Sequence, residues 1–383
     1  MVMNSKFQGW KSIALIAPAA LVVASGWPVT AQEGPSGITI PRVLPPFDRS
    51  AAACSPPPSL GKTLVFAQDN EREFIQGVGR GLSMAARDRG LAYSRAVAHN
   101  DGNKMIEQVE SFRSSNTGAL VVAPVDPASL APAIRRMIWQ GAYVGAVVPP
   151  PATSLLNAPQ YLTGKVLGDA AAAHIRDKLK GKANIVLLTH DSLQFLAPRF
   201  VAMRESLKGM PGATIVADIS PTTVNKEGGF SMMQKILLAH PDIDVILGAD
   251  TVVLGALAAV REAGKVRADQ FFGGIDGEPE AVDEIKKGGP YKISISLASS
   301  VFGYAMGQHA ADWLEGKSIP QAMDILPSPL TLSNIALYES DLANPGGVYN
   351  DPVRRDAYLK MYGNICFDSR DQYVNFPWSS ERR

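Results

Sequence analysis

Short apolar runs and amphipathic stretches alternate along the first part of this chain. Residues 63–67 form an apolar run, and a helical pattern of apolar positions follows over residues 74–89. The same order recurs before residue 150, with a predicted strand at 93–98 and apolar runs at 119–123 and 144–148. Runs of this length are typical of strands buried on both faces, and strands that alternate with helices predict a parallel, doubly wound sheet.

The alternation starts again after a helical pattern at residues 165–179. Further predicted strands follow at 185–189, 214–219, 245–248 and 292–297, and most of them are separated by helical patterns. A parallel pair of strands needs a crossover connection, and helices of this length supply one. Two sets of like construction therefore predict two similar α/β lobes rather than one large sheet.

One stretch of the second set joins a strand to polar residues. The apolar run at residues 271–275 is followed at once by Asp276 and Gly277, and then by a helical pattern from residue 281. Asp276 therefore falls at the carboxyl end of a predicted strand, which is where ligands collect in open α/β sheets. An Asp-Gly pair also opens turns and caps helices, so the residues alone leave both roles open.

The amino-terminal end has the pattern of a secretory signal. Lys6 and Lys11 precede an apolar run at residues 13–24. Residues 29–31 (VTA) then give the small-x-small pattern that signal peptidase cleaves. We expect residues 1–31 to be a signal peptide, with an uncleaved anchor as the alternative. Residues 32–61 are rich in proline and predict an extended tail.

Charge and motifs exclude several classes of function. Lys plus Arg number 37 against 36 for Asp plus Glu, so no basic excess indicates nucleic acid. The sequence has no GxSxG, HExxH or CxxC motif, and its five histidines are scattered. We therefore expect no enzyme, no catalytic residues, no cofactor and no metal site.

The chain has two cysteines, Cys54 near its start and Cys366 near its end. Export would place both in an oxidising compartment, where paired cysteines form disulfides. We predict a Cys54–Cys366 disulfide that ties the two tails together.

Several segments together resemble one known family. These segments are GLSMAARDRG at Gly81, ALVVAPVDPASLAPAIRRMIWQGAYV at Ala119, VLGDAAAAHI at Val166, LLAHPDIDVILGADTVVLGALAAVREAGK at Leu237 and FFGGIDGEPEAVDEIKKG at Phe271. They resemble the type I periplasmic binding proteins, the ribose-binding type of ABC importers. The resemblance runs from about residue 62 to residue 332.

The resemblance implies a domain plan and a ligand site. The family has two lobes joined by a hinge of three crossings, here near Thr163, Ala298 and Thr331, and it closes over a ligand between them. On this plan, lobe 1 comprises residues 62–163 and 298–331, and lobe 2 comprises residues 164–297 and 332–340. Residues 341–383 would be a carboxyl-terminal extension, which we expect to be an extended tail pinned by its cysteine.

Carried over residue by residue, the resemblance implies ligand-binding roles for Phe74, Asn100, Arg199, Asp250 and Asp276. The aromatic ring would stack on the apolar face of a sugar, and the polar side chains would bind hydroxyl groups. Each of these residues also has a plain structural role, as a core, surface, turn or cap residue.

Other positions depart from the family pattern. The residues Val148-Pro149, Ala249 and Leu297 replace polar residues, and Glu71-Arg72-Glu73 replaces an Asn-Asn-Pro loop. A site with these residues is less polar than one for ribose. Ribose is therefore not the expected ligand.

The sequence as a whole predicts an exported, periplasmic solute-binding protein. It would capture a sugar-like or less polar small molecule and deliver it to an ABC permease in the inner membrane, acting as a monomer. A periplasmic sensor that presents its ligand to a receptor or to an exported enzyme system is the alternative. A transcription regulator would need an amino-terminal DNA-binding segment, which the sequence lacks.

Overall fold

The computed structural model describes residues 34–147, 151–190 and 193–381. The predicted signal peptide and the pair Val148-Pro149 lie outside these residues. No helix in the described part of the chain has the length and apolar character needed to cross a membrane.

The first sheet has seven strands in the order β13-β11-β5-β4-β3-β1-β2. All neighbouring strands are parallel except β13, which pairs antiparallel with β11 at one edge. The bounds are β1 Thr63–Gln68, β2 Ala92–Val97, β3 Ala119–Ala123, β4 Tyr143–Ala146, β5 Ser154–Asn157, β11 Ala322–Ile325 and β13 Leu359–Tyr362. Every residue of the interior strand β3 is buried, as expected where helices cover both faces of a parallel sheet.

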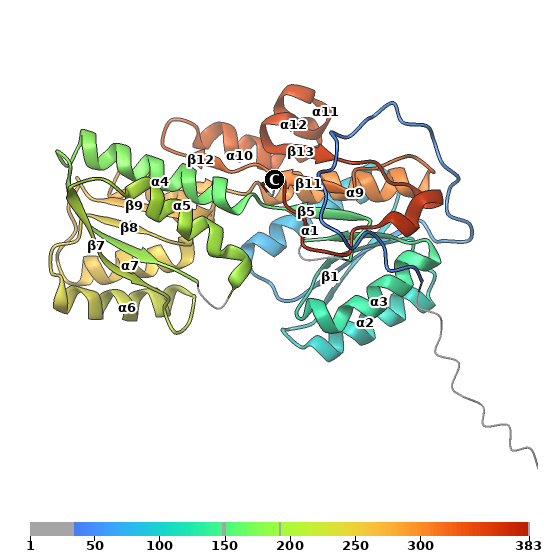
Figure 1. The fold of residues 1–383 in the computed structure, drawn as a ribbon, viewed down its shortest axis with the longest axis horizontal. Helices are drawn as coiled ribbons and strands as arrows, with labels where there is room; N and C mark the ends of the chain where they lie inside the picture. The colour runs from blue at the N-terminus through green and yellow to red at the C-terminus, as the bar shows by residue number, and fades with distance from the viewer. Residues whose placement is uncertain (1–33, 148–150, 191–192, 382–383) are drawn as a thin grey trace, which may run out of the picture. The chain divides into compact units, whose positions relative to one another are not determined.

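Helices cover both faces of the first sheet (Figure 1). The helices are α1 Glu73–Asp88, α2 Gly102–Ser114, α3 Pro127–Gln140 and α9 Ser299–Leu314. The helices α2 and α3 lie on one face, and α1 packs with α9 on the other. The α1–α9 contact is close because α1 carries glycines, and a Cβ at Gly81 would collide with the backbone of Ser300.

The second sheet has six strands in the order β12-β10-β9-β8-β6-β7. The bounds are β6 Lys182–Leu188, β7 Gly212–Ile219, β8 Val245–Leu247, β9 Phe271–Asp276, β10 Tyr291–Ser296 and β12 Ser328–Leu330. Its helices are α4 Gln160–Asp177, α5 Ala197–Leu207, α6 Lys226–Ala239, α7 Asp250–Glu262 and α8 Pro279–Lys286, preceded at α5 by the 3₁₀ turn η1 Gln194–Leu196. The helices α4 and α5 lie on one face and α6 and α7 on the other (Figure 1). The two-lobed, doubly wound fold predicted from the sequence is confirmed.

The chain passes between the two sheets more often than the hinge prediction requires. It leaves the first sheet after β5, returns after β10, and leaves again between β11 and β12. A fourth passage joins these three, because β13 returns to pair with β11 in the first sheet.

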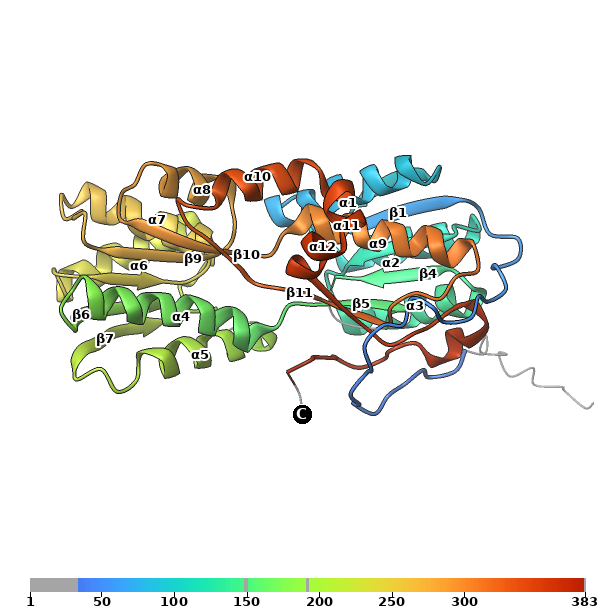
Figure 2. The same cartoon turned by 90° about the horizontal axis from the view of Figure 1, so that it is seen from above.

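The segment after β12 is folded, so the prediction of an extended tail is wrong for this end. It contains the helices α10 Ile335–Ala343, α11 Pro345–Asn350 and α12 Pro352–Tyr358, then β13 and the 3₁₀ segment η2 Phe367–Gln372. The last helices of this segment pack through buried apolar residues such as Val348 and Tyr349, and β13 satisfies its backbone against β11. Figure 2 shows α10 between α8 and α11.

The amino-terminal tail has no regular helix or strand, and it is joined to the carboxyl-terminal segment. Cys54 and Cys366 form a disulfide with their Cα atoms 6.1 Å apart, which confirms the predicted pairing. Close to it, the backbone of Phe47 donates to Met361 O at 3.0 Å, and Gly363 N donates to Pro45 O at 2.7 Å. A disulfide and backbone hydrogen bonds therefore join the amino-terminal tail to the carboxyl-terminal segment.

Candidate ligand-binding site

We call the carboxyl ends of the strands of each sheet its rim. The rim of the second sheet carries Arg199, in the first turn of α5. This residue is only 5% exposed, and its Nε donates to Gln160 Oε1 at 2.8 Å. The close approach of α4 fixes its backbone, since a Cβ at Gly164 would collide with it. Burial lowers the pKa of Arg199, and the nearby charge of Asp276 acts in the opposite direction.

Asp276, the last residue of β9, has an unusual backbone conformation. Its φ is +119°, outside the region that residues with side chains favour, so the turn at this point is strained. Among the described residues, no hydrogen bond or ion pair is made to its carboxylate. Burial raises the pKa of Asp276, whereas the positive charges of Arg199 and Arg72 lower it.

Asp250 lies behind this turn and supports it. Its carboxylate accepts hydrogen bonds from Tyr291 Oη at 2.7 Å, Ser294 Oγ at 2.6 Å and the backbone of Glu278 at 2.9 Å. Burial raises the pKa of Asp250 to about 6, and Asp276 adds to the shift. Because all three donors belong to the protein, the clearest role of Asp250 is to hold the turn after β9. Its predicted contact with a ligand stays a prediction.

Glu278 is a second acid on this turn. It is half-buried, and burial together with the charges of Asp250 and Asp276 raises its pKa to about 8. The rim of the second sheet therefore brings three carboxyl groups and one arginine close together. The predicted residues Arg199, Asp250 and Asp276 all lie in this cluster.

The rim of the first sheet carries Phe74 and Asn100. Phe74 is partly buried in α1, and its ring centroid lies 5.8 Å from that of Phe302 in α9. Asn100 is exposed, has a φ of +61°, and its Oδ1 accepts from Asn70 Nδ2 at 3.1 Å. Asn70 Nδ2 also donates to Asp69 Oδ2 at 3.2 Å, and Asn70 Oδ1 accepts from Arg72 Nε at 2.9 Å. Most polar groups of this rim are thus paired with one another.

Charged residues at the start of α1 affect the pKa values of acids on the second rim. Arg72 lowers the pKa of Asp276, and Glu73 raises the pKa of Glu278. The replacement of an Asn-Asn-Pro loop by Glu71-Arg72-Glu73 therefore puts charge near the second rim.

Sequence reasoning missed several polar residues of the two rims. Gln160 fixes Arg199, and Glu278 lies beside Asp276. Gln68 and Thr189, at the ends of β1 and β6, are buried, and one side-chain oxygen of each has no partner in the described structure. Their positions directly after apolar runs are a signal that could have found them.

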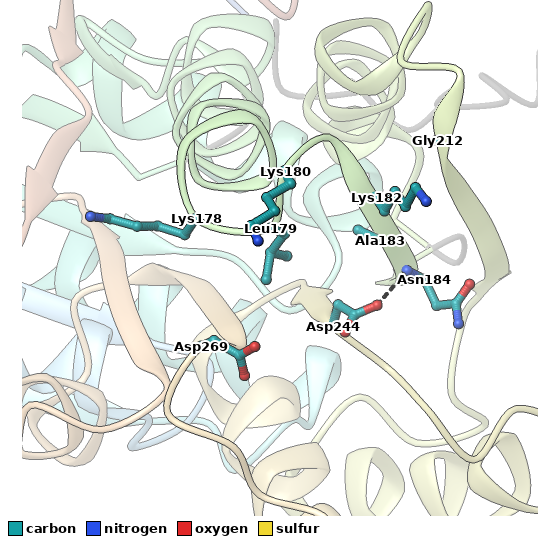
Figure 3. A pocket seen from close by; sticks show the side chains of 9 residues that line it. All are labelled: Lys178, Leu179, Lys180, Lys182, Ala183, Asn184, Gly212, Asp244 and Asp269. Atoms are coloured by element: carbon teal, nitrogen blue, oxygen red, sulfur yellow. Dashed lines mark hydrogen bonds between the residues drawn. The ribbon is translucent and has the colours of Figure 1, made fainter.

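A hollow lies at the amino ends of the strands of the second sheet, opposite its rim. It has a volume of about 460 Å³ and includes Lys182 and Gly212, the first residues of β6 and β7 (Figure 3). Its lysines Lys178, Lys180 and Lys182 are exposed to solvent. The residues carried over from the family lie at the other strand ends, so this hollow is not the predicted site.

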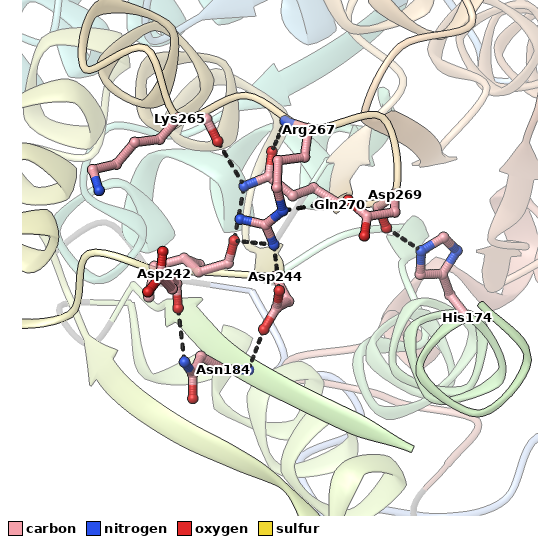
Figure 4. Close-up of polar contacts among 9 residues, drawn as sticks. His174, Asn184, Asp242, Asp244, Lys265, Arg267, Asp269 and Gln270 are labelled. Carbon is pink, nitrogen blue, oxygen red and sulfur yellow. Dashed lines mark hydrogen bonds and ion pairs between the residues drawn. The ribbon is translucent and has the colours of Figure 1, made fainter. Parts of the chain in front are cut away.

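At the same end of the second sheet, polar contacts hold loops and strands together (Figure 4). The carboxylate of Asp244 accepts from the backbone of Asn184 at 2.8 Å and pairs with Arg267. His174 Nε2 lies 2.7 Å from the carbonyl oxygen of Asp269. These contacts close the loops between strands and leave no convergent set of groups for a ligand.

In the described residues, no group of three or more His, Cys, Asp and Glu side chains is arranged to hold a metal ion. The acids of the second rim instead surround an arginine. With a donor in Arg199 and acceptors in Asp276 and Glu278, this rim can bind a small polar solute through hydrogen bonds.

Two lobes with strand-end rims of this kind form an arrangement that suits the capture of a small solute. The family model for the periplasmic binding protein domain matches residues 63–318. The chain therefore belongs to the periplasmic binding proteins, and to their type I, sugar-binding branch that serves ABC transporters.

Curated relatives agree with this assignment. The chain is 28% identical over 279 residues to the ribose import binding protein RbsB of Bacillus subtilis, a match covering 68% of this chain and 82% of that protein. It is also 28% identical over 249 residues to a xylitol-binding protein of Mycolicibacterium smegmatis, covering 63% of this chain and 68% of that protein.

Solved structures share the fold. A periplasmic ribose ABC transporter protein of Conexibacter woesei has a TM-score of 0.64 at 21% identity, covering 74% of this chain and 96% of that one. A solute-binding protein of Bacillus halodurans with bound myo-inositol has a TM-score of 0.64 at 20% identity, covering 74% and 99%. The neighbours are thus matched almost completely, whereas about a quarter of this chain has no counterpart in them.

Proposed function

We propose that this protein captures a small, uncharged solute between its two rims and delivers it to an ABC permease. The solute is a deoxy sugar, a polyol derivative, or a less polar metabolite of similar size. Relatives named for ribose and xylitol, and a neighbour with bound myo-inositol, support this class. The ligand-binding residues are Phe74, Asn100, Arg199 and Asp276, with Asp250 holding the turn that presents Asp276.

The proposal rests mainly on the burial, charge and lack of ion-pair partners of Arg199 and Asp276. Arg199 is buried and Asp276 is half-buried, they carry opposite charges, and neither has an ion-pair partner among the described residues. A buried charge without partners is costly, so a ligand that binds both groups recovers free energy. Since the two charges balance, an uncharged solute with donors and acceptors fits them better than an ion.

Two replacements favour a solute less polar than ribose. Leu297 is buried in the apolar core, and Ala249 packs against that core. Neither can bind a hydroxyl group, and a desolvated hydroxyl without a partner costs about 1–3 kcal/mol. A ligand with fewer hydroxyl groups avoids this cost.

The remaining parts of the proposal concern export and assembly. Residues 1–31 direct the protein to the periplasm, where the Cys54–Cys366 disulfide forms and persists. The protein acts as a monomer, because one chain supplies both rims. Its membrane partner is the permease of an ABC importer.

A thermal-shift screen of the exported protein against pentoses, deoxy sugars, polyols and small alcohols tests the proposal. A ligand at a hundred times its dissociation constant stabilises the protein by about 2.7 kcal/mol, which moves the melting temperature measurably. We expect at least one polyol or deoxy sugar to do so and Asp276→Ala to abolish the shift. Stabilisation only by charged solutes, or chemical conversion of a bound compound, would overturn the proposal.

A further inference from the structure

The carboxyl-terminal segment, which lies beyond the family match at residues 63–318, touches the turn that presents Asp276. Tyr338 of α10 accepts a hydrogen bond from Ser296 Oγ at 2.5 Å. Ser296 is the strand partner of Asp276 in β10. A Cβ placed on Gly277 would lie 2.8 Å from Ser296 Oγ and 3.0 Å from Tyr338 Oη. The hydroxyl group of Tyr338 therefore lies close behind the strained turn.

Tyr338 is held in this position by burial and by its helix. The residue is 5% exposed, and burial raises its pKa to about 12, so its hydroxyl group stays protonated at neutral pH. The next residue, Glu339, pairs with Lys286 of α8 at 2.5 Å. Two contacts thus attach α10 to the second lobe, one at the turn and one at α8.

The other end of α10 is attached to the first lobe. Ser300 Oγ, in the first turn of α9, donates to Leu342 O at 3.1 Å. The buried carboxylate of Asp341 accepts from Tyr358 Oη at 2.7 Å and pairs with Arg354, which fixes α10 to α12. The following helix α11 packs on α9.

These contacts form a continuous path between the two rims. Helix α9 packs along α1, and Phe302 of α9 faces Phe74 of α1 at 5.8 Å. The path therefore runs from the Asp276 turn through Tyr338 and α10 to the helix that carries Phe74. The strand β10, which leads into the crossing near Ala298, also contacts this turn through Ser294 and Ser296. The path through Tyr338 and α10 is a second connection, which reaches α9 from outside the strands.

We propose that α10 is a strap that couples the Asp276 turn to the α1–α9 helix pair, with Tyr338 as the positioning residue. It keeps Asp276 in its strained conformation before the ligand arrives and links that conformation to the position of the first lobe. Its effect on affinity depends on the proposed solute-binding function. Its effect on the ligand-free turn does not.

The first experiment measures amide hydrogen exchange across residues 271–280 of the ligand-free protein. Gly277 N donates to Ser294 Oγ at 3.0 Å and reports on the turn. Tyr338→Phe keeps the ring and removes the acceptor of Ser296, so we expect exchange to rise about three- to tenfold, the effect of one hydrogen bond. Tyr362→Phe is the matched control, because its hydroxyl binds Asp324 at 3.0 Å on the first sheet.

A second variant separates a strap from a local support. Ser300→Ala removes the link between α9 and Leu342 without touching the Asp276 turn. If α10 is a strap, Ser300→Ala also speeds exchange at residues 271–280. If only Tyr338→Phe does so, Tyr338 supports the turn locally and the strap is refuted. Equal exchange in wild type, Tyr338→Phe and Tyr362→Phe refutes both roles.

Once the screen has identified a ligand, calorimetry measures its dissociation constant and stopped-flow measures its dissociation rate. We expect Tyr338→Phe to weaken binding about three- to tenfold, mostly through faster dissociation, while Tyr362→Phe binds like wild type. A variant that lowers the urea midpoint but leaves the dissociation constant unchanged would show a merely structural role. If no solute binds, the proposed function fails, and the exchange data still decide the role of α10.

Discussion

The two rims of this protein are built in opposite ways. On the second sheet, Arg199 and Asp250 are buried, and the half-buried Asp276 has a φ of +119°. On the first sheet, Asn100 is exposed and pairs with Asn70. The second rim holds its charges at a cost, whereas the first consists of turns whose polar groups are largely satisfied.

The difference indicates how the two lobes divide the work of binding. Buried charges and a strained turn persist only where the surrounding structure holds them, and such features cluster at binding sites. Amide groups on an exposed turn that already form hydrogen bonds do not destabilise the ligand-free protein, and a ligand lowers their free energy only slightly. We infer that the second lobe supplies most of the affinity and that the first lobe supplies an aromatic surface and adaptable amides.

The largest effect is expected from Asp250→Ala. This change leaves Tyr291, Ser294 and the Glu278 amide without their acceptor, so we expect a loss of about 3 kcal/mol in the free energy of unfolding. Binding should weaken as well, because the turn that presents Asp276 loses its support. Urea denaturation and calorimetry measure the two effects.

The matched control for Asp250 is Asp283→Ala in α8. That side chain is 67% exposed and lies 4.0 Å from Lys286, so its loss should change stability by less than about 0.5 kcal/mol. If Asp250→Ala were as mild as Asp283→Ala, the second rim would not be held by its acids, and the comparison of the rims would fail.

Arg199→Ala and Asp276→Ala should each weaken ligand binding by more than about tenfold, since each removes a charged hydrogen-bonding group from a desolvated site. Neither change should unfold the protein, because among the described residues Asp276 has no hydrogen-bond partner and Arg199 has only Gln160. Asp276→Asn removes the charge but keeps the size of the side chain, and asparagine is among the residues enriched at positive φ. This variant therefore distinguishes an effect of charge from an effect of shape. Unchanged calorimetric affinity in both alanine variants would refute the site.

The repeating units of the fold could be read from the sequence because local patterns determine them. The run at residues 119–123 is β3 without change, and the run at 63–67 is β1 with one more residue. Buried parallel strands are continuous apolar runs, which a reader finds easily. Asp276 was found at a strand end for the same reason.

The parts that the sequence did not reveal depend on distant partners. β13 is a short strand that pairs with the edge strand β11. The helix α11 begins in the stretch Asn344-Pro345-Gly346-Gly347, whose proline and glycines are typical of a loop. The role of Asp250 as a support depends on Tyr291 and Ser294, which follow more than forty residues later in the chain. No local pattern predicts such a contact.

A smaller effect concerns Glu278 and pH. Its pKa is raised in the folded protein to about 8 from an ordinary value of 4.5. The folded state therefore holds a proton that the unfolded state has lost, and stability falls as pH rises from about 4.5 to about 8. Glu278→Gln removes this dependence, so the variant should gain stability relative to wild type across that window.

The measurement for Glu278 is the difference in urea midpoint between Glu278→Gln and wild type, taken at several pH values. The difference should be small near pH 5, grow towards pH 8 and then level off. Glu280→Gln is the control, since this neighbour is exposed and pairs with Lys226 at the surface. Parallel curves for both variants would show that Glu278 is ionised throughout and that the second rim is more open to water than its burial indicates.

The smallest effect is expected from Asn100→Ala on the first rim. The side chain is exposed, and the substitution gives up the hydrogen bond from Asn70 at 3.1 Å, so ligand affinity should fall by less than about threefold. Because Asn100 has a φ of +61°, alanine strains the turn, and Asn100→Gly is needed to separate the amide from the backbone. If Asn100→Gly weakened binding as much as Arg199→Ala, the first rim would contribute as much affinity as the second. The buried charges would then reflect how the second lobe folds rather than how it binds.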